Sequence, residues 1–323
     1  MFRNKLVLMV TAAALVSFSS AVYAENYPSK EIRIIVPTKP GGSIDRTARS
    51  IQKFLPASIG QSVIVENVKG AGGKLGTRKF MNSPKDGYTL VSHFVPGTTI
   101  MGAKNPKLIK FSDLAIINLQ WSDPVIIIAQ KKSGWKSLDD MIKAVKGSPG
   151  KYSYGSSGIS SAGYVLSARL FKELGLKIKI VPYDGGGKAR AAFKGGHVDM
   201  TAGGAGGARR VRDSAVVLGA FWNGKVPGWP EAKPLSKLLG KYNASVPEGG
   251  AFRFIAVHKG VKEKHPARFK KLVAAMKKAV QSSEFKAFAK KSKVGSEWNG
   301  PEKSTAILKK IDAGFVDMIG SAK

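Results

Sequence analysis

The sequence predicts an α/β protein with two domains, in which helices cover a largely parallel sheet. Its 323 residues exceed the roughly 250–300 at which a single hydrophobic core stops growing. Apolar, β-rich segments alternate with segments of helical periodicity, which is typical of α/β layers. This pattern restarts near Pro124, so that each half of the chain carries a strand, a turn rich in Ser and Gly, and a helix.

The first half opens with a β-rich segment, residues 31–36, that leads to the turn Pro40-Gly41-Gly42. Apolar residues spaced i, i+4, i+7 and i+11 then predict a helix: Ile44, Ala48, Ile51 and Leu55. We expect Ser43 to cap this helix, and Asp45 in its first turn suits the positive end of the helix dipole. The rest of this half is predicted to contain a strand at 62–66, a glycine loop at 70–76 with a short helical segment after it, and a strand at 89–92.

The second half follows the same plan of strand, turn and helix. Strands are predicted at residues 125–130, 152–154, 177–182, 197–201 and 216–221. Helices are predicted at residues 137–145, 162–174 and 188–193. We interpret residues 227–250 as a connection, 252–257 as a returning strand, and 266–319 as helical and strongly basic.

Residues 1–24 have the features of a secretory signal peptide and are kept apart from the fold. Arg3 and Lys5 form a basic start, residues 6–18 are apolar, and Ala24 is a small residue suited to cleavage. The alternative is a membrane anchor, but the apolar run is short of the roughly 17–25 residues that span a bilayer. Since no later stretch is long enough to cross a membrane, we expect an exported, soluble protein in a bacterial periplasm.

The composition argues against several classes of function. Cysteine is absent, which excludes disulfides, thiolate metal sites and cysteine nucleophiles. The four histidines show no metal-ligand spacing, and we expect neither a metal nor a cofactor. An enzyme is the alternative, but Ser161 lacks the first glycine of the G-x-S-x-G motif. Lys74 is followed by Leu75 where a phosphate loop has Ser or Thr, so we expect no catalytic activity.

The two strand–turn–helix units, at residues 37–45 and 154–164, share one physical capability. A helix N-terminus leaves backbone N–H groups unpaired and carries partial positive charge. Glycines let a ligand approach the backbone, and serines add hydroxyl donors. Two such turns facing each other across a cleft would hold one carboxylate or phosphate from both sides. The alternative is that each turn merely links a strand to a capped helix.

A set of short motifs occurs in a fixed order along the chain after the signal peptide. They are residues 27–37 (YPSKEIRIIVP), 40–45 (PGGSID), 60–67 (GQSVIVEN), 70–73 (GAGG), 86–90 (DGYTL), 154–158 (YGSSG), 181–186 (VPYDGG) and 195–199 (GGHVD). In this order they resemble the Bug/TctC family, the extracytoplasmic solute receptors of tripartite tricarboxylate transporters. The resemblance covers most of the chain up to about residue 200 and becomes vague toward the C-terminus.

The resemblance implies a type II periplasmic-binding-protein fold, with two α/β domains that are joined by two crossing strands and close over a ligand in the cleft between them. Domain 1 would comprise residues 25–124 and 252–323, and domain 2 residues 125–251. The implied ligand-binding residues are Gly41, Gly42, Ser43 and Asp45 in one turn, Ser156, Ser157, Gly158 and Ser161 in the other, and Thr98, Asp184 and Thr201 toward the distal end of the ligand.

The sequence departs from the family pattern at three places in the candidate site. Thr38 and Lys39 stand where small or aromatic residues are usual, and Lys39 either contacts a second acidic group of the ligand or faces solvent. Tyr164 stands where the second helix often begins with histidine. Asp184 stands where relatives are often basic, and we expect it to disfavour a polyanion and to favour an amino or hydroxyl group on the ligand.

The implied function is capture of a small organic carboxylate and its delivery to the membrane permease subunits of a tripartite transporter. We expect a monomer and no nucleic-acid partner. A formal net charge of +32 leaves open a second interpretation, a basic exported protein that binds a polyanion or anionic lipid. A receptor that reports to a membrane sensor is a further alternative, and mono-, di-, tri- and aromatic carboxylates all remain open as ligands.

Overall fold

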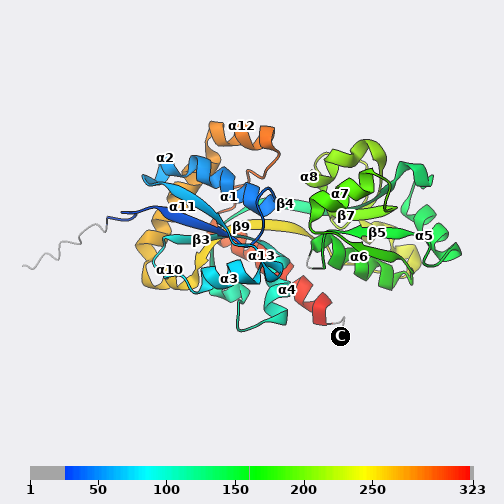
Figure 1. Ribbon diagram of the computed structural model, residues 1–323, viewed down its shortest axis with the longest axis horizontal. Helices are drawn as coiled ribbons and strands as arrows, with labels where there is room; N and C mark the ends of the chain where they lie inside the picture. The colour runs from blue at the N-terminus through cyan, green and yellow to red at the C-terminus, as the bar shows by residue number, and fades with distance from the viewer. Residues whose placement is uncertain (1–25, 160, 321–323) are drawn as a thin grey trace, which may run out of the picture.

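The computed structural model describes residues 26–159 and 161–320, so the predicted signal peptide lies outside the described residues. Two lobes lie side by side along the long axis of the molecule (Figure 1). Two crossing strands, β4 (Leu114–Gln130) and β9 (Gly250–His258), run between them. The first lobe holds both the N-terminal elements and the last helices of the chain. This arrangement confirms the α/β class that the sequence predicts.

Nine strands form one curled sheet in the order β2-β1-β3-β9-β4-β7-β5-β6, with β8 also paired to β4. The remaining strands are β1 (Ile32–Val36), β2 (Val63–Asn67), β3 (Thr89–Val95), β5 (Ser153–Ser156), β6 (Lys179–Pro182), β7 (Met200–Gly204) and β8 (Ala215–Ala220). β1 pairs in parallel with β2 and β3, and β5 with β6 and β7. The pairs that involve β4 or β9 are antiparallel, so the sheet is less parallel than predicted.

The crossing strand β4 belongs to both lobes. Residues 114–124 pair with β9, and residues 125–130 pair with β7 and β8. The sequence analysis recognised only the second part as a strand, because Asn118 and Gln120 interrupt the apolar pattern of the first. Both side chains are fully buried: Asn118 Nδ2 donates to Glu297 O at 2.8 Å, and Gln120 Nε2 to Ser50 Oγ at 3.4 Å.

The helices pack on both faces of the sheet. In the first lobe they are α1 (Ser43–Phe54), α2 (Pro56–Ile59), α3 (Lys74–Met81), α4 (Gly97–Lys104), α10 (Lys259–Lys264), α11 (Pro266–Gln281), α12 (Ser283–Ser292) and α13 (Gly300–Gly320). In the second lobe they are α5 (Leu138–Gly147), α6 (Ala162–Glu173), α7 (Gly186–Lys194), α8 (Ala205–Ala208) and α9 (Leu235–Leu238). α4 was not predicted, and α9 lies inside the predicted connection 227–250. No helix in the described ranges combines the length and apolar character that a membrane crossing requires.

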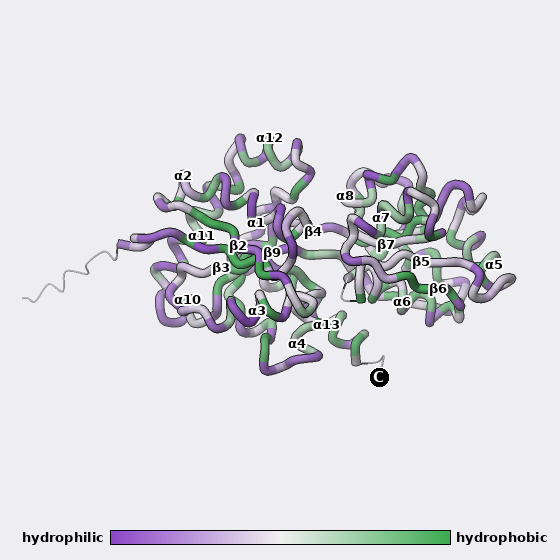
Figure 2. Tube along the Cα trace, in the orientation of Figure 1, coloured by the Kyte–Doolittle hydropathy of each residue, from purple (hydrophilic) through white to green (hydrophobic). Residues whose placement is uncertain are grey.

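Apolar residues are frequent in the central strands (Figure 2), and the buried positions of the helices are also largely apolar. The predicted apolar positions of α1 are confirmed as core residues, since Ile44 is 7% exposed and Ala48 and Ile51 are fully buried. One apolar cluster continues from lobe to lobe along the crossing strands and includes Val125 and Phe252. Burial of such side chains stabilises the fold by about 1.5–3 kcal/mol each. The turns between strands and helices are therefore held at both ends by well-packed secondary structure.

Candidate functional site

The first turn connects β1 to α1 and leaves the N-terminus of α1 open. Gly41 has a φ of +81°, which an L side chain rarely adopts. Gly42 is the N-cap residue, and no side chain accepts a hydrogen bond from the first turn of the helix. The prediction that Ser43 caps this helix is wrong, because Ser43 is already its first helical residue. The free N–H groups and the dipole of α1 are thus available to an anion.

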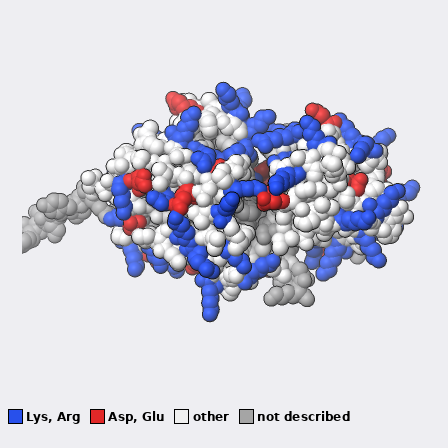
Figure 3. All heavy atoms as spheres, viewed as in Figure 1, with Lys and Arg blue, Asp and Glu red and all other residues white. Residues whose placement is uncertain are grey.

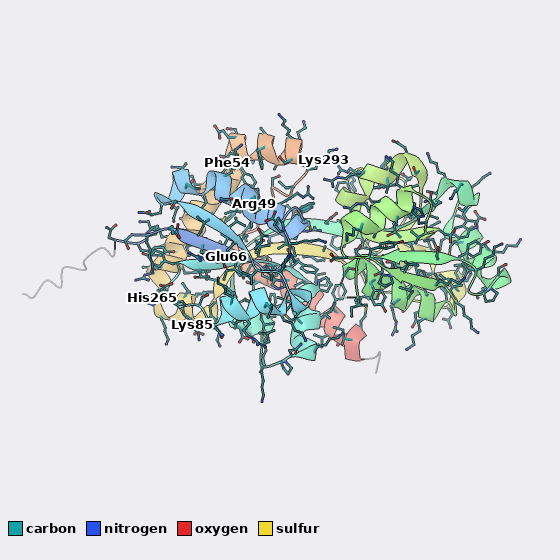
Figure 4. All side chains as sticks on the ribbon, viewed as in Figure 1. Arg49, Phe54, Glu66, Lys85, His265 and Lys293 are labelled. Atoms are coloured by element: carbon teal, nitrogen blue, oxygen red, sulfur yellow. The ribbon has the colours of Figure 1, made fainter. Side chains whose placement is uncertain are left out.

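Asp45 holds the first turn in place through hydrogen bonds to its carboxylate. Its side chain is 1% exposed, and its carboxylate accepts hydrogen bonds from Gly41 N at 2.8 Å and from Asn67 Nδ2 at 2.9 Å. Arg49, one helical turn further along α1 (Figure 4), donates from Nε at 3.0 Å. These partners tie the turn to β2 and to its own helix. Asp45 therefore acts as a positioning residue, and its direct contact with a ligand stays a prediction.

The second turn connects β5 to α6 and is built mainly from serines. Ser161 caps α6, with its Oγ accepting a hydrogen bond from Tyr164 N at 3.2 Å. Ser156 is 1% exposed, and its Oγ accepts from Gly158 N at 3.2 Å, where Gly158 has a φ of +103°. Each hydroxyl keeps its own O–H for donation, because it only accepts in these contacts. Ser157 between them is half-buried.

A third loop, residues 183–186 between β6 and α7, contacts both turns. Lys39 of the first turn donates from Nζ to Asp184 Oδ2 at 2.7 Å and to Asp184 O at 3.0 Å. On the other side of this loop, Ser157 Oγ lies 3.5 Å from the point that a Cβ on Gly186 would occupy. The loop therefore lies close to both turns, and Figure 3 shows basic side chains along the junction of the lobes.

The ion pair of Lys39 and Asp184 changes the expectations for both residues. The hydrogen bond from Lys39, with its positive charge, lowers the pKa of Asp184 and keeps that carboxylate ionised. Both side chains are exposed, at 47% for Lys39 and 77% for Asp184. Because each charge partly neutralises the other, this ion pair would weaken the repulsion of a polyanion by Asp184, and the effect of Asp184 on ligand choice stays a prediction. In this arrangement Lys39 is bound to Asp184, so it is not a free cation for the ligand.

Of the remaining candidate residues, Thr98 and Thr201 use their hydroxyl groups within the fold. Thr98 is 3% exposed and donates to Phe94 O at 2.8 Å, and Thr201 is 4% exposed and donates to Gly155 O at 2.7 Å. Thr38 has a buried Oγ1 with no hydrogen-bond partner in the described part of the chain. Tyr164 is half-buried on the first turn of α6. Contacts of these residues with a ligand stay predictions.

The comparisons with known proteins assign the chain to a family. The chain matches the model of the TctC family, the tripartite tricarboxylate transporter family receptor, over residues 47–310. It belongs to this family. BugT of Bordetella pertussis is 33% identical over 190 residues, which cover 57% of this chain and 58% of BugT. A protein of Agrobacterium vitis, from the TAR-I ttuE-ttuC' intergenic region, is 32% identical over 178 residues, which cover 54% of this chain and 51% of that protein. The chain thus spans just over half the length of these curated relatives.

Solved structures show that this TctC-family chain has the fold of periplasmic solute-binding proteins. The periplasmic binding protein BugD superposes with a TM-score of 0.75 at 22% identity, covering 92% of this chain and 98% of BugD. MatC of Rhodopseudomonas palustris, with bound malate, superposes with a TM-score of 0.74 at 22% identity, covering 91% of this chain and 100% of MatC. An R. palustris protein with adipate gives 0.72 at 18% identity, with 91% and 96% covered. The predicted type II periplasmic-binding-protein fold is confirmed.

The sequence analysis missed one group of polar residues in this TctC-family chain. Arg46, Arg190 and Arg253 come close enough for their charges to act on one another and on Asp123 of β4. One signal was present, because Arg253 stands between Phe252 and Phe254 in a strand that is otherwise apolar. Arg46 and Arg190 gave no signal, since each is an ordinary polar residue in an amphipathic helical pattern.

Proposed function

We propose that this TctC-family protein is a periplasmic receptor that captures a small organic carboxylate between its two turns. The segment 1–24 would export it, and it would deliver its ligand as a monomer to the membrane subunits of a tripartite transporter. The receptor performs no chemistry on the ligand and uses no cofactor. The two lobes would act as domains, with residues 25–124 and 252–323 in one and residues 125–251 in the other.

One observation carries this proposal: the β6–α7 loop contacts Lys39 of the first turn and lies beside Ser157 of the second. Donors on both turns can therefore reach one carboxylate. The first turn offers uncapped N–H groups of α1, and the second offers the hydroxyls of Ser156 and Ser161. A hydrogen bond to a charged group contributes about 1.5–3 kcal/mol. Four or five such bonds would supply the roughly 8 kcal/mol of micromolar binding and offset the cost of ordering the site.

The same geometry explains how a ligand would favour closure. A carboxylate that contacts both turns binds the closed arrangement better than any arrangement in which the turns are apart. Ligand binding then shifts the population toward closure by this difference in affinity. The related structures with malate and adipate support dicarboxylates as a starting point for the ligand search. The excess of Lys and Arg over Asp and Glu would also raise the rate at which anions are captured at low salt.

The test is a pair of substitutions at Gly42, the N-cap of α1. This residue has a φ of −69° and a ψ of 169°, and its added Cβ would come no closer than 3.7 Å to Lys39 O, so other residues fit there. Gly42→Asp places a carboxylate where the ligand should bind, whereas Gly42→Asn caps the helix without the charge. Wild-type protein is first screened by thermal shift against organic acids, and hits are measured by calorimetry.

We expect Gly42→Asp to weaken binding of the identified acid at least tenfold more than Gly42→Asn does. Both variants should unfold at or slightly above the wild-type temperature, because Asp and Asn are better caps than Gly. Equal affinities in the two variants would remove the first turn from the site. A wild-type protein that binds none of the acids, including malate and adipate, would overturn the proposed function.

A further inference from the structure

Four arginine side chains gather where the lobes join, and we call them the arginine cluster. Arg46 comes from α1, Arg190 from α7, Arg210 from the 3-10 helix η4 (Arg209–Ser214) and Arg253 from β9. The first lobe, the second lobe and a crossing strand thus each contribute positive charge. The contacts that shape the two turns do not involve these guanidinium groups. The cluster therefore needs a separate explanation.

Arg253 forms the buried base of the cluster. Its side chain is 6% exposed, and its guanidinium carbon lies 4.2 Å above the centre of the Trp121 ring. Nη1 donates to Asp123 Oδ2 at 3.2 Å and to Ala251 O at 3.0 Å. Nε is buried and has no hydrogen-bond partner in the described ranges. An unpaired buried donor costs about 1–3 kcal/mol, so it is a place where an acceptor would be favourable.

Arg46 approaches the same aromatic ring from the first lobe. Its guanidinium carbon lies 5.2 Å from the centre of Trp121, and Nη1 donates to Ser292 O at 3.3 Å. Two guanidinium groups on one indole gain from its electron-rich face, but they also repel each other. Burial, followed by the charges of Arg210 and Arg253, lowers the pKa of Arg46. The ring therefore collects two cations, and both share Asp123 as a counter-ion.

Arg190 lies between the other arginines and the second turn of the candidate site. Its Nη1 lies 2.9 Å from the Cβ position of Gly186 and 3.0 Å from that of Gly207, so it rests against two residues without side chains. The Ser157 hydroxyl lies 3.5 Å from the same point above Gly186. A small ligand whose carboxylate is held at the second turn can therefore reach Arg190 with its other end.

The charges of the cluster do not balance. Asp123 is its acidic member, and its second oxygen, Oδ1, is already used by Gly206 N at 2.9 Å. Within residues 26–159 and 161–320, neither Arg190 nor Arg210 has an ion pair or a hydrogen bond. Burial, then the charges of Arg210 and Arg46, lowers the pKa of Arg190. Four positive charges thus face two negative charges, Asp123 and, beside Arg253, Glu297, so positive charge is in excess in this partly buried site.

We propose that the arginine cluster is a subsite for a dianionic phosphoryl or phosphono group on the same ligand whose carboxylate binds at the two turns. This proposal rests on the proposed function. A carboxylate has two oxygens and one charge, whereas a phosphonate has three oxygens and two charges. Guanidinium groups that arrive from α1, α7, η4 and β9 suit a tetrahedral group better than a planar one. Arginine is also the residue best suited to hold such oxyanions with paired N–H donors.

The test compares 3-phosphonopropionate with succinate, which differ mainly in having a phosphonate or a carboxylate at one end. Affinities are measured by calorimetry at about pH 8, where the second phosphoryl proton is largely lost. 2-Phosphoglycolate is the third probe and distinguishes phosphate esters from phosphonates. The variant is Arg190→Gln, and its control is Lys188→Gln on the same helix, where the lysine is exposed. Arg190→Gln should fold normally, because it removes no ion pair.

We expect wild-type protein to bind 3-phosphonopropionate or 2-phosphoglycolate at least tenfold more tightly than succinate. Arg190→Gln should remove most of that advantage and change succinate binding less than threefold, and Lys188→Gln should change neither. Equal wild-type affinities, or an equal loss for all probes in Arg190→Gln, would overturn the subsite. If carboxylates bind and Gly42→Asp abolishes that binding, the proposed function survives this failure. If the phosphorylated probes bind and Gly42→Asp does not weaken that binding, the first turn is not part of the binding site, whereas the arginine subsite is retained.

Discussion

The two turns of the candidate site present a helix N-terminus in different ways. At the first turn, a buried carboxylate from the helix itself, Asp45, holds Gly41 from behind and leaves the N-cap position to a glycine. At the second turn, the cap residue Ser161 uses its own hydroxyl oxygen to accept a hydrogen bond from the helix. The first turn is thus rigid with open backbone donors, and the second offers side-chain donors that can rotate.

This difference suggests that the two turns would contribute differently to ligand affinity and ligand selection. A rigid set of N–H groups needs little ordering when a ligand arrives, so its hydrogen bonds are realised at small entropic cost. Serine hydroxyls can follow carboxylates of different shape, which suits a turn that must adapt. We therefore expect the first turn to determine how tightly an anion binds, and the second to determine which anion fits.

The strongest test of the rigid turn is Asp45→Asn. The carboxylate accepts hydrogen bonds from Gly41, Asn67 and Arg49, and an amide cannot accept all of them. Losing charged hydrogen bonds at a site that is 1% exposed should lower the free energy of unfolding by about 2–3 kcal/mol. Ligand affinity should fall as well, because the turn is no longer held. Chemical denaturation and calorimetry measure both effects.

The control for this substitution is Asp213→Asn in the second lobe. Asp213 is exposed, and it forms no hydrogen bond or ion pair with another described residue. This change should leave both stability and affinity within error of wild type. If Asp45→Asn were as harmless as Asp213→Asn, the first turn would not depend on its buried carboxylate, and the contrast between the turns would disappear.

Acid should weaken the lobe that carries the rigid turn. His93 on β3 is 2% exposed, and burial lowers its pKa from 6.5 to about 4. The unfolded chain binds this proton below about pH 6.5, whereas the folded chain does so only near pH 4. The free energy of unfolding should therefore fall as pH decreases through this window, by about 2 kcal/mol at pH 5. The contribution of His93 to this loss should be complete once the pH lies about one unit below its folded pKa.

The pH effect is measured by denaturation at pH 7.5 and at pH 5. His93→Gln should abolish most of the difference, while His197→Gln, at an exposed position of the second lobe, should preserve it. A wild-type protein that is equally stable at both pH values would show that His93 is not kept neutral by the fold.

The contrast between the turns also shows what the sequence can predict. The apolar spacing of Ile44, Ala48 and Ile51 gave α1 correctly, because burial of one helix face leaves a local periodic pattern. The cap was wrong, since Ser43 and Gly42 are adjacent and only backbone geometry decides which residue begins the helix. The ion pair of Lys39 and Asp184 joins residues 145 positions apart, and no local pattern reports such a contact.

The arginine cluster escaped the sequence analysis for a related reason. Arg46 and Arg190 belong to helices in different lobes, and they approach each other only because β4 and β9 cross between those lobes. The strand β4 itself was recognised in part, since buried Asn118 and Gln120 break the apolar alternation on which recognition depends. Tertiary contacts explain both omissions: polar side chains are buried here because distant residues supply their partners.

The adaptable turn is tested by Ser161→Ala. The change removes the cap of α6 and one hydroxyl donor, so the free energy of unfolding should fall by about 1 kcal/mol. Ser282→Ala is a matched control, because Ser282 caps α12 in the same way by accepting from Phe285 N at 3.1 Å. Both variants should lose similar stability in denaturation. Only Ser161→Ala should change the ranking of ligands, and an unchanged ranking would remove this serine from ligand selection.

The smallest effect is expected at the ion pair that joins the first lobe to the second, Lys39 with Asp184. Lys39→Gln breaks the ion pair with Asp184, and because both side chains are exposed, water compensates most of the loss. The ligand-free protein should become slightly more open, with a larger radius of gyration in small-angle scattering, and Lys143→Gln on the surface of α5 should not change it. Since Lys39 lowers the pKa of Asp184, the pair should persist down to pH 5 and dissociate only as Asp184 is protonated in stronger acid. If the protein opened between pH 7 and pH 5, and Lys39→Gln showed the same opening, the titration of a group other than Asp184 would cause it.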